Sequence, residues 1–137
     1  MPLKKIHSFM MSQQFTDFGL LILRLGFGGI MLFAHGLPKL SGFADYADKF
    51  PDPIGLGSTT SLALAVFGEF FCGIALCLGL FTRYAAIPFS ITMFVAAFIQ
   101  HAPDPWQKKE MAVLYLVAGV VMALTGPGKY SVDARMR

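Results

Sequence analysis

The apolar run from Phe18 to Lys39 constrains the fold of this chain more than any other stretch. It is about as long as a bilayer-spanning helix, which takes ~20 residues, yet it carries Arg24, His35 and Lys39. A central arginine in hydrocarbon costs roughly 2.5–3.5 kcal/mol unless it is paired. Arg24 and His35 are about three helical turns apart, so we expect them to project from the same side. The run therefore predicts a membrane helix that packs closely against partner helices.

Composition supports the same class of protein. Hydrophobic residues make up 55% of the 137 residues and charged residues only 14%, whereas soluble domains are typically ~25% charged. Four apolar segments are expected to be transmembrane helices: residues 18–40, 58–80, 84–101 and 110–124. A soluble helical domain would need polar faces that these segments lack. We predict an all-α polytopic membrane protein in which four helices form a bundle. The chain is expected to be one domain over residues 1–137, with no cleavable signal peptide.

The first loop, residues 41–57, has a helical pattern of its own. Phe43, Tyr46 and Phe50 recur at helical spacing, while Asp45 and Asp48 take the other face. Such a pattern predicts a short interfacial helix lying in the headgroup layer. The alternative is an ordinary hydrated loop.

The distribution of Lys and Arg predicts the orientation. With four spans, one side holds six of them: Lys4, Lys5, Arg83, Lys129, Arg135 and Arg137. The other side holds four: Lys39, Lys49, Lys108 and Lys109. The positive-inside tendency then places both termini in the cytoplasm.

Glu69, close to the centre of the second span, is the most informative single residue. A carboxylate at that depth must be protonated or paired with a base, so we expect Arg24 or His35 within direct or water-bridged reach. These three residues form a candidate proton-relay cluster. The alternative is that Glu69 only locks the bundle. Cys72 and Cys77, five residues apart on one helix, are interpreted as packing residues rather than a redox pair.

Several other polar residues, among them Lys39, His101, Trp106 and Glu110, are expected in the outer third of the bundle. Counting ~1.5 Å per residue from the expected helix ends places them in one polar column inside the bundle. The candidate lining of a proton-accessible pocket is Lys39, His101, Trp106, Glu110 and Tyr115. His35 and His101 on different helices could instead ligate haem or a metal. We disfavour that alternative, because a histidine in a bundle is more often a hydrogen-bonded core residue.

Short motifs in order along the chain resemble those of the DoxX family. They are L-R-L-x-x-G around Arg24, A-H-G-x-x-K at 34–39, G-E-F-x-x-G at 68–73, G-L-x-T-R at 79–83, the set His101, Trp106 and Glu110, and G-P-G-K-Y-S-V-D at 126–133. The resemblance implies a small four-helix protein of the bacterial inner membrane. It also implies a relation to a thiosulfate:quinone oxidoreductase subunit, although most members have no assigned substrate. The positions carried over are Arg24, His35, Lys39, Glu69, Arg83, His101 and Glu110.

Two functions of different classes follow. The first is a quinone-linked membrane oxidoreductase component, in which Glu69 and His35 relay protons. The second is a non-catalytic subunit or small-solute carrier whose polar column serves assembly or passage. The sequence contains no dinucleotide fingerprint and no C-x-x-C motif, so electrons are expected from a redox partner protein or a bound cofactor. Lipid and a possible second copy of the chain are the other expected partners; nucleic acid is not.

Overall fold

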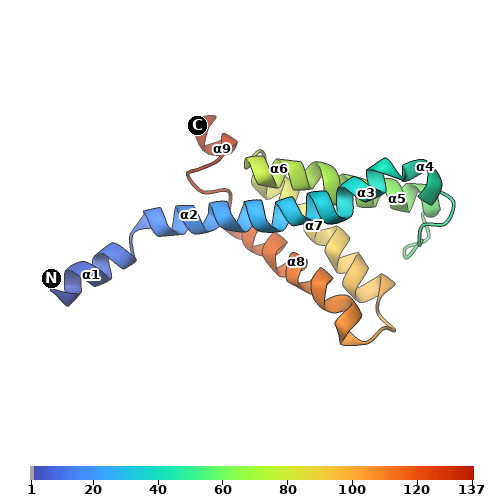
Figure 1. Cartoon of the computed structure of the whole chain (residues 1–137), viewed down its shortest axis with the longest axis horizontal. Helices are drawn as coiled ribbons and strands as arrows, with labels where there is room; N and C mark the ends of the chain where they lie inside the picture. The colour runs from blue at the N-terminus through green and yellow to red at the C-terminus, as the bar shows by residue number, and fades with distance from the viewer. Residues whose placement is uncertain (1) are drawn as a thin grey trace.

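The computed structural model describes residues 2–137, which form helices and no β-strand. Four long helical segments follow one another (Figure 1). The first helix comprises α1 (Leu3–Met10), α2 (Gln13–Leu23), η1 (Arg24–Gly28), η2 (Met31–Gly36) and α3 (Leu37–Ser41). The second comprises α5 (Ser58–Val66), η3 (Phe67–Phe71) and α6 (Cys72–Leu78). The third comprises α7 (Thr82–Phe94) and η4 (Val95–Gln100), and the fourth is α8 (Trp106–Thr125).

Three of these segments are long and apolar enough to cross a membrane: Leu3–Ser41, Ser58–Leu78 and Thr82–Gln100. The fourth, α8, has 20 residues but carries Lys108, Lys109 and Glu110 near its start. Large apolar side chains point outward along the bundle, such as Phe33 at 68% exposure and Ile91 at 59%. The structure therefore confirms an all-helical chain with three helices that could cross a membrane.

Two short helices complete the chain. In the first loop, α4 (Phe43–Tyr46) forms within the region where a short helix was expected. Its position relative to a lipid surface stays a prediction. Near the C-terminus, α9 (Val132–Arg135) is capped by Ser131, whose hydroxyl accepts a hydrogen bond from the Ala134 N–H.

The long helices are interrupted by wider, π-helical turns at η1, η2, η3 and η4. The η2 turn ends just before Pro38, which has no N–H to donate to the preceding turn. Such turns occur frequently at functional sites. Arg24, His35 and Glu69, the three residues of the predicted relay, all lie in them.

Glycines allow the first and second helices to approach closely. A side-chain carbon at Gly36 would lie 2.7 Å from the Phe70 backbone nitrogen and 2.8 Å from the Glu69 carbonyl carbon. Further along the pair, a carbon at Gly28 would lie 3.3 Å from the Gly73 oxygen. This contact brings the turn that carries Glu69 against the first helix.

The core between the helices is apolar. Met31, Leu76, Phe89 and Met122 are all buried there with 1% exposure or less. Cys72 belongs to the same core, and Cys72 and Cys77 are both free thiols.

The C-terminal segment, residues 126–133, folds back across the ends of the helices. Asp133 accepts hydrogen bonds from the N–H groups of Phe81 (2.7 Å) and Thr82 (2.9 Å), where α7 begins. The Lys129 N–H donates to the Asp17 carboxylate at 3.2 Å. The start of α2 and the C-terminal segment thus lie at the same end of the molecule (Figure 1).

Candidate functional site

A cavity of about 570 Å³ lies between the four helices and the first loop. Its volume falls within the range of small-molecule sites, ~300–1,000 Å³. Apolar side chains such as Met31, Phe67 and Met93 make up most of its wall. Its polar residues are His35, Lys39, Ser61, Glu69, Thr92, Gln100, His101, Lys108 and Tyr115. The cavity therefore suits a largely apolar molecule with a few polar atoms.

Glu69 forms an ion pair with Lys39 inside this cavity. The Lys39 ammonium donates to Glu69 Oε1 at 3.2 Å and lies 3.1 Å from Oε2. It also donates to the His35 carbonyl oxygen at 3.4 Å. Glu69 is buried, at 6% exposure, and its Oε2 receives no well-aligned hydrogen bond from residues 2–137. A buried carboxylate with an incompletely used oxygen can accept a hydrogen bond from a bound molecule.

His35 lies against Tyr115, with ring centroids 5.9 Å apart in an edge-to-face arrangement. Tyr115 is 3% exposed and also packs edge-to-face on Phe27 and Phe89. The aromatic cluster restricts the orientation of the imidazole at the cavity wall. His35 therefore presents an imidazole, which can donate and accept hydrogen bonds, at the cavity wall.

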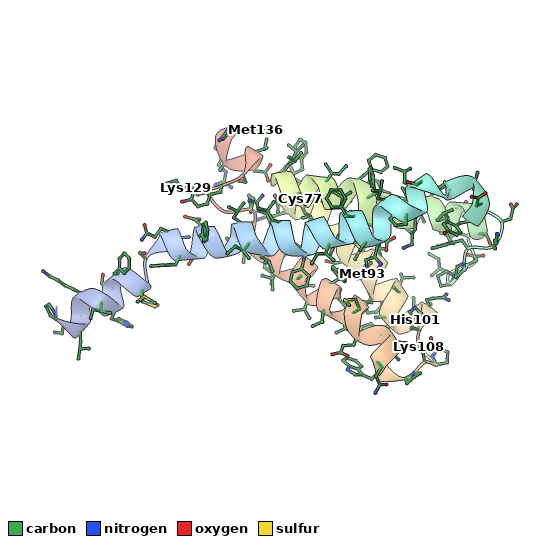
Figure 2. The ribbon with its side chains drawn as sticks, viewed as in Figure 1. Cys77, Met93, His101, Lys108, Lys129 and Met136 are labelled. Atoms are coloured by element: carbon green, nitrogen blue, oxygen red, sulfur yellow. The ribbon has the colours of Figure 1, made fainter. Side chains whose placement is uncertain are left out.

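His101 and Asp104 form a second polar pair at the end of the third helix. The His101 Nδ1 is 2.7 Å from Asp104 Oδ2. The hydrogen bond from His101 lowers the pKa of Asp104 below its ordinary value, although partial desolvation opposes the shift. Figure 2 labels His101 and Lys108 on either side of the turn that joins the third and fourth helices. Because Nδ1 is held by Asp104, Nε2 is the ring nitrogen left for a molecule in the cavity.

Arg24 lies apart from this cavity, which corrects the predicted Arg24–His35–Glu69 cluster. Its guanidinium donates to the carbonyl oxygens of Leu76 (3.4 Å), Cys77 (3.3 Å) and Tyr130. Arg24 and His35 are eleven residues apart, which is about 16 Å along the helix axis. Their side chains, even on the same side of the helix, are therefore too far apart to contribute to one site. Arg24, at 1% exposure, instead caps the second helix and holds the C-terminal segment.

Trp106 and Glu110, both predicted to line the pocket, are exposed and lie outside it. Successive residues in a helix are rotated by about 100°, so Lys108, Met111, Ala112 and Tyr115 share one face of α8. Those four residues line the cavity. Trp106 and Glu110 project from the opposite face.

Some cavity residues were not anticipated from the sequence. They are the polar side chains of Ser61, Thr92, Gln100 and Lys108, and the loop residues Phe50, Pro51, Pro53 and Ile54. Asp104 was also missed as the partner of His101, although the H-x-x-D spacing at 101–104 was a visible signal. The other residues carry no such signal, because whether they line the cavity depends on which helix faces meet and on the course of the first loop.

Comparison with known proteins places these features in a family. The family model described as DoxX matches residues 19–102, more than half of the chain. A Haemophilus influenzae protein named "Uncharacterized protein" is 29% identical over 126 residues, covering 86% of this chain and 83% of its own. A Bacillus subtilis protein named "Putative oxidoreductase CatD" is 31% identical over 118 residues, covering 85% of this chain and 86% of its own. No solved structure matches. The matched region contains Arg24, His35, Lys39, Glu69 and His101, and the chain belongs to the DoxX family.

Proposed function

We propose that this protein is an integral membrane oxidoreductase component that binds a quinone in the cavity and handles its protons. One observation carries the proposal: an apolar cavity of about 570 Å³ contains both the Lys39–Glu69 ion pair, with Glu69 buried, and two histidines. A quinone has an apolar ring and two carbonyl oxygens, and its reduction takes up two electrons and two protons. The name of the Bacillus subtilis relative is consistent with redox chemistry.

The polar residues of the cavity have distinct roles in this proposal. The Lys39 ammonium stabilises negative charge that develops on a carbonyl oxygen. Glu69 and His35 accept and release protons, which is general acid–base catalysis. His101, oriented by Asp104, is the group nearest the aqueous turn and exchanges protons with water. Electrons come from a redox partner protein or a bound cofactor.

We further propose four membrane spans, with α8 as the fourth. The contact between Asp17 and Lys129 supports this topology, because two segments at one end of the bundle are separated by an even number of crossings. The 20 residues of α8 span about 30 Å, enough for the hydrocarbon core. The excess of Lys and Arg at that end supports cytoplasmic termini in the bacterial inner membrane.

The test compares Glu69→Gln and His35→Gln with Glu110→Gln. Glutamine keeps volume and hydrogen bonding but cannot transfer a proton. We expect quinone-dependent turnover to fall about 10²–10⁴-fold in the first two variants and to be unchanged in the third, whose side chain lies outside the cavity. Membrane level is checked by blotting. A visible spectrum and organic extraction of the purified wild-type protein identify the bound molecule.

Full activity of well-expressed Glu69→Gln would overturn the proton-handling role. It would favour the second candidate, a non-catalytic subunit or small-solute carrier. One observation supports that candidate: the Lys39–Glu69 pair joins the first and second helices, as a structural lock would.

A further inference from the structure

We propose that the end of the molecule carrying both termini binds an anionic phospholipid. The phosphate of the lipid occupies a groove of about 460 Å³ between the end of the second helix and the C-terminal segment. The groove is lined by Leu78, Lys129, Tyr130, Ser131, Val132 and Arg135. It is separate from the cavity between the helices, and the proposal does not depend on quinone chemistry.

Two exposed cations give the groove its charge. Lys129 and Arg135 both line it, and neither forms an ion pair with an acidic side chain of residues 2–137. The neighbouring carboxylates are occupied by backbone groups instead. Asp17 accepts the Lys129 N–H, and Asp133 accepts the N–H groups at the start of α7. The groove therefore offers two positive charges to a phosphodiester.

The groove also has an apolar side that suits acyl chains. Leu78, the last residue of α6, is 51% exposed, and Tyr130 is 45% exposed. Tyr130 packs edge-to-face on Phe18, with centroids 6.5 Å apart, at the start of the apolar run of the first helix. An amphipathic ring at the boundary between a basic segment and an apolar helix surface is typical of the membrane interface. Figure 2 shows Lys129 at this end, near the labelled Cys77 of the second helix.

The helix α1 extends the same surface. It projects beyond the bundle (Figure 1), and every one of its residues is exposed. Leu3, Ile6 and Met10 share one face, whereas Lys4 and Lys5 point elsewhere. The first acidic residue of the chain is Asp17. A basic amphipathic helix beside a membrane span fits the headgroup layer of an anionic leaflet.

The test measures lipid binding to the purified full chain in detergent by native mass spectrometry. Phosphatidylglycerol is compared with phosphatidylcholine, which has the same acyl chains but no net charge. We expect the wild type to bind phosphatidylglycerol more tightly. The double variant Lys129→Gln/Arg135→Gln should bind phosphatidylglycerol at least about tenfold more weakly than the wild type does. The matched control, Lys49→Gln/Lys109→Gln, removes two charges at the other end and should bind it as the wild type does.

Three results would overturn the proposal: equal binding of the two lipids, equal loss in both double variants, or competition by inorganic phosphate at concentrations as low as those of phosphatidylglycerol. Lys4→Gln/Lys5→Gln tests the contribution of α1 and should weaken phosphatidylglycerol binding without affecting phosphatidylcholine. Unchanged binding in that variant would remove α1 from the site. The substituted side chains lie on the surface, so each variant is expected to fold. Melting temperatures of all variants check this.

Discussion

At the scale of single residues, Lys39 and Glu69 form the ion pair at the wall of the cavity. The pair joins α3 to η3, with nitrogen–oxygen distances of 3.1 and 3.2 Å. Lys39 retains 25% side-chain exposure, whereas the Glu69 side chain retains 8%. Moving two charges out of water is costly, and their attraction repays this only while both partners are present. Removing one partner is therefore expected to cost more than removing both.

We predict that Lys39→Met destabilises the protein by about 3 kcal/mol, because it leaves Glu69 as an unpaired buried carboxylate. Lys39→Met/Glu69→Gln should recover most of the loss, since no charge then stays buried. The measurement is the melting temperature in detergent at pH 7.5. Equal melting temperatures for the single and double variants would show that the unpaired Glu69 carboxylate is not the cause of the destabilisation.

At the scale of helices, the contact between η2 and η3 positions the ion pair. Gly36 lies directly against the backbone of Glu69 and Phe70. Any side chain there must push the two helices apart. Gly26, in η1 of the same helix, has no atom within 4 Å of the corresponding position. The two glycines therefore separate the effect of close packing from that of helix propensity.

We predict that Gly36→Ala destabilises the protein by about 1–3 kcal/mol through overpacking. Gly26→Ala should be neutral or stabilising by up to about 1 kcal/mol, because alanine favours helix more than glycine does. Melting temperatures of the two variants, each compared with wild type, give the measurement. A Gly36→Ala protein as stable as Gly26→Ala would contradict the packing described here.

The cap at the start of α7 is a second element-scale feature. Burial raises the pKa of Asp133, but hydrogen bonds from Thr82 and Phe81 outweigh it, so the pKa lies below the ordinary value of an aspartate. A lowered pKa means that the carboxylate stabilises the fold above the unfolded-state pKa, about 3.9. The stabilisation is lost as the pH falls through the lower, folded-state pKa.

We predict that Asp133→Ala costs about 1 kcal/mol at pH 7, a typical value for loss of a helix cap. The difference in melting temperature between wild type and Asp133→Ala should be constant from pH 7 to pH 5. It should narrow only below about pH 4. If the melting-temperature difference has already disappeared at pH 5, the ionised form of Asp133 is not the form that stabilises the fold.

At the scale of the whole molecule, the first helix and the C-terminal segment meet at one end. Arg24 joins them by donating to Leu76 and Cys77 in the second helix and to Tyr130 in the C-terminal segment. Gly79, in a left-handed conformation (φ 68°), makes room for the guanidinium and for Ser131. The proposed four-span topology, in which this end faces the cytoplasm, can be tested directly.

We predict that Arg137→Cys, in a variant lacking Cys72 and Cys77, reacts with a membrane-impermeant maleimide only after cell lysis. Asp48→Cys, in the exposed first loop, should react in intact cells. The two sites lie on opposite sides of the membrane if the chain crosses it four times with cytoplasmic termini. Labelling of Arg137→Cys in intact cells would rule out that orientation.

The sequence by itself determined the class of the protein and drew attention to the ionisable residues within its apolar runs. A membrane-spanning helix can be predicted from its local sequence alone. Hydrocarbon offers no hydrogen bonds, so every backbone polar group must be bonded within the helix itself. An ionisable residue in such a run is conspicuous for the same energetic reason, which is how Glu69 and Arg24 were identified. The short motifs likewise sufficed for the family.

The tertiary structure decided which of these residues meet. The sequence cannot specify how wider turns rotate a helix or how closely two helices approach, and these set the partner of each side chain. Lys39 rather than Arg24 pairs with Glu69 because Gly36 brings η3 against the first helix at that level. Lys108 rather than Glu110 lines the cavity because α8 turns that face toward the third helix. Pairing between helices is non-local, and only the packed bundle determines it.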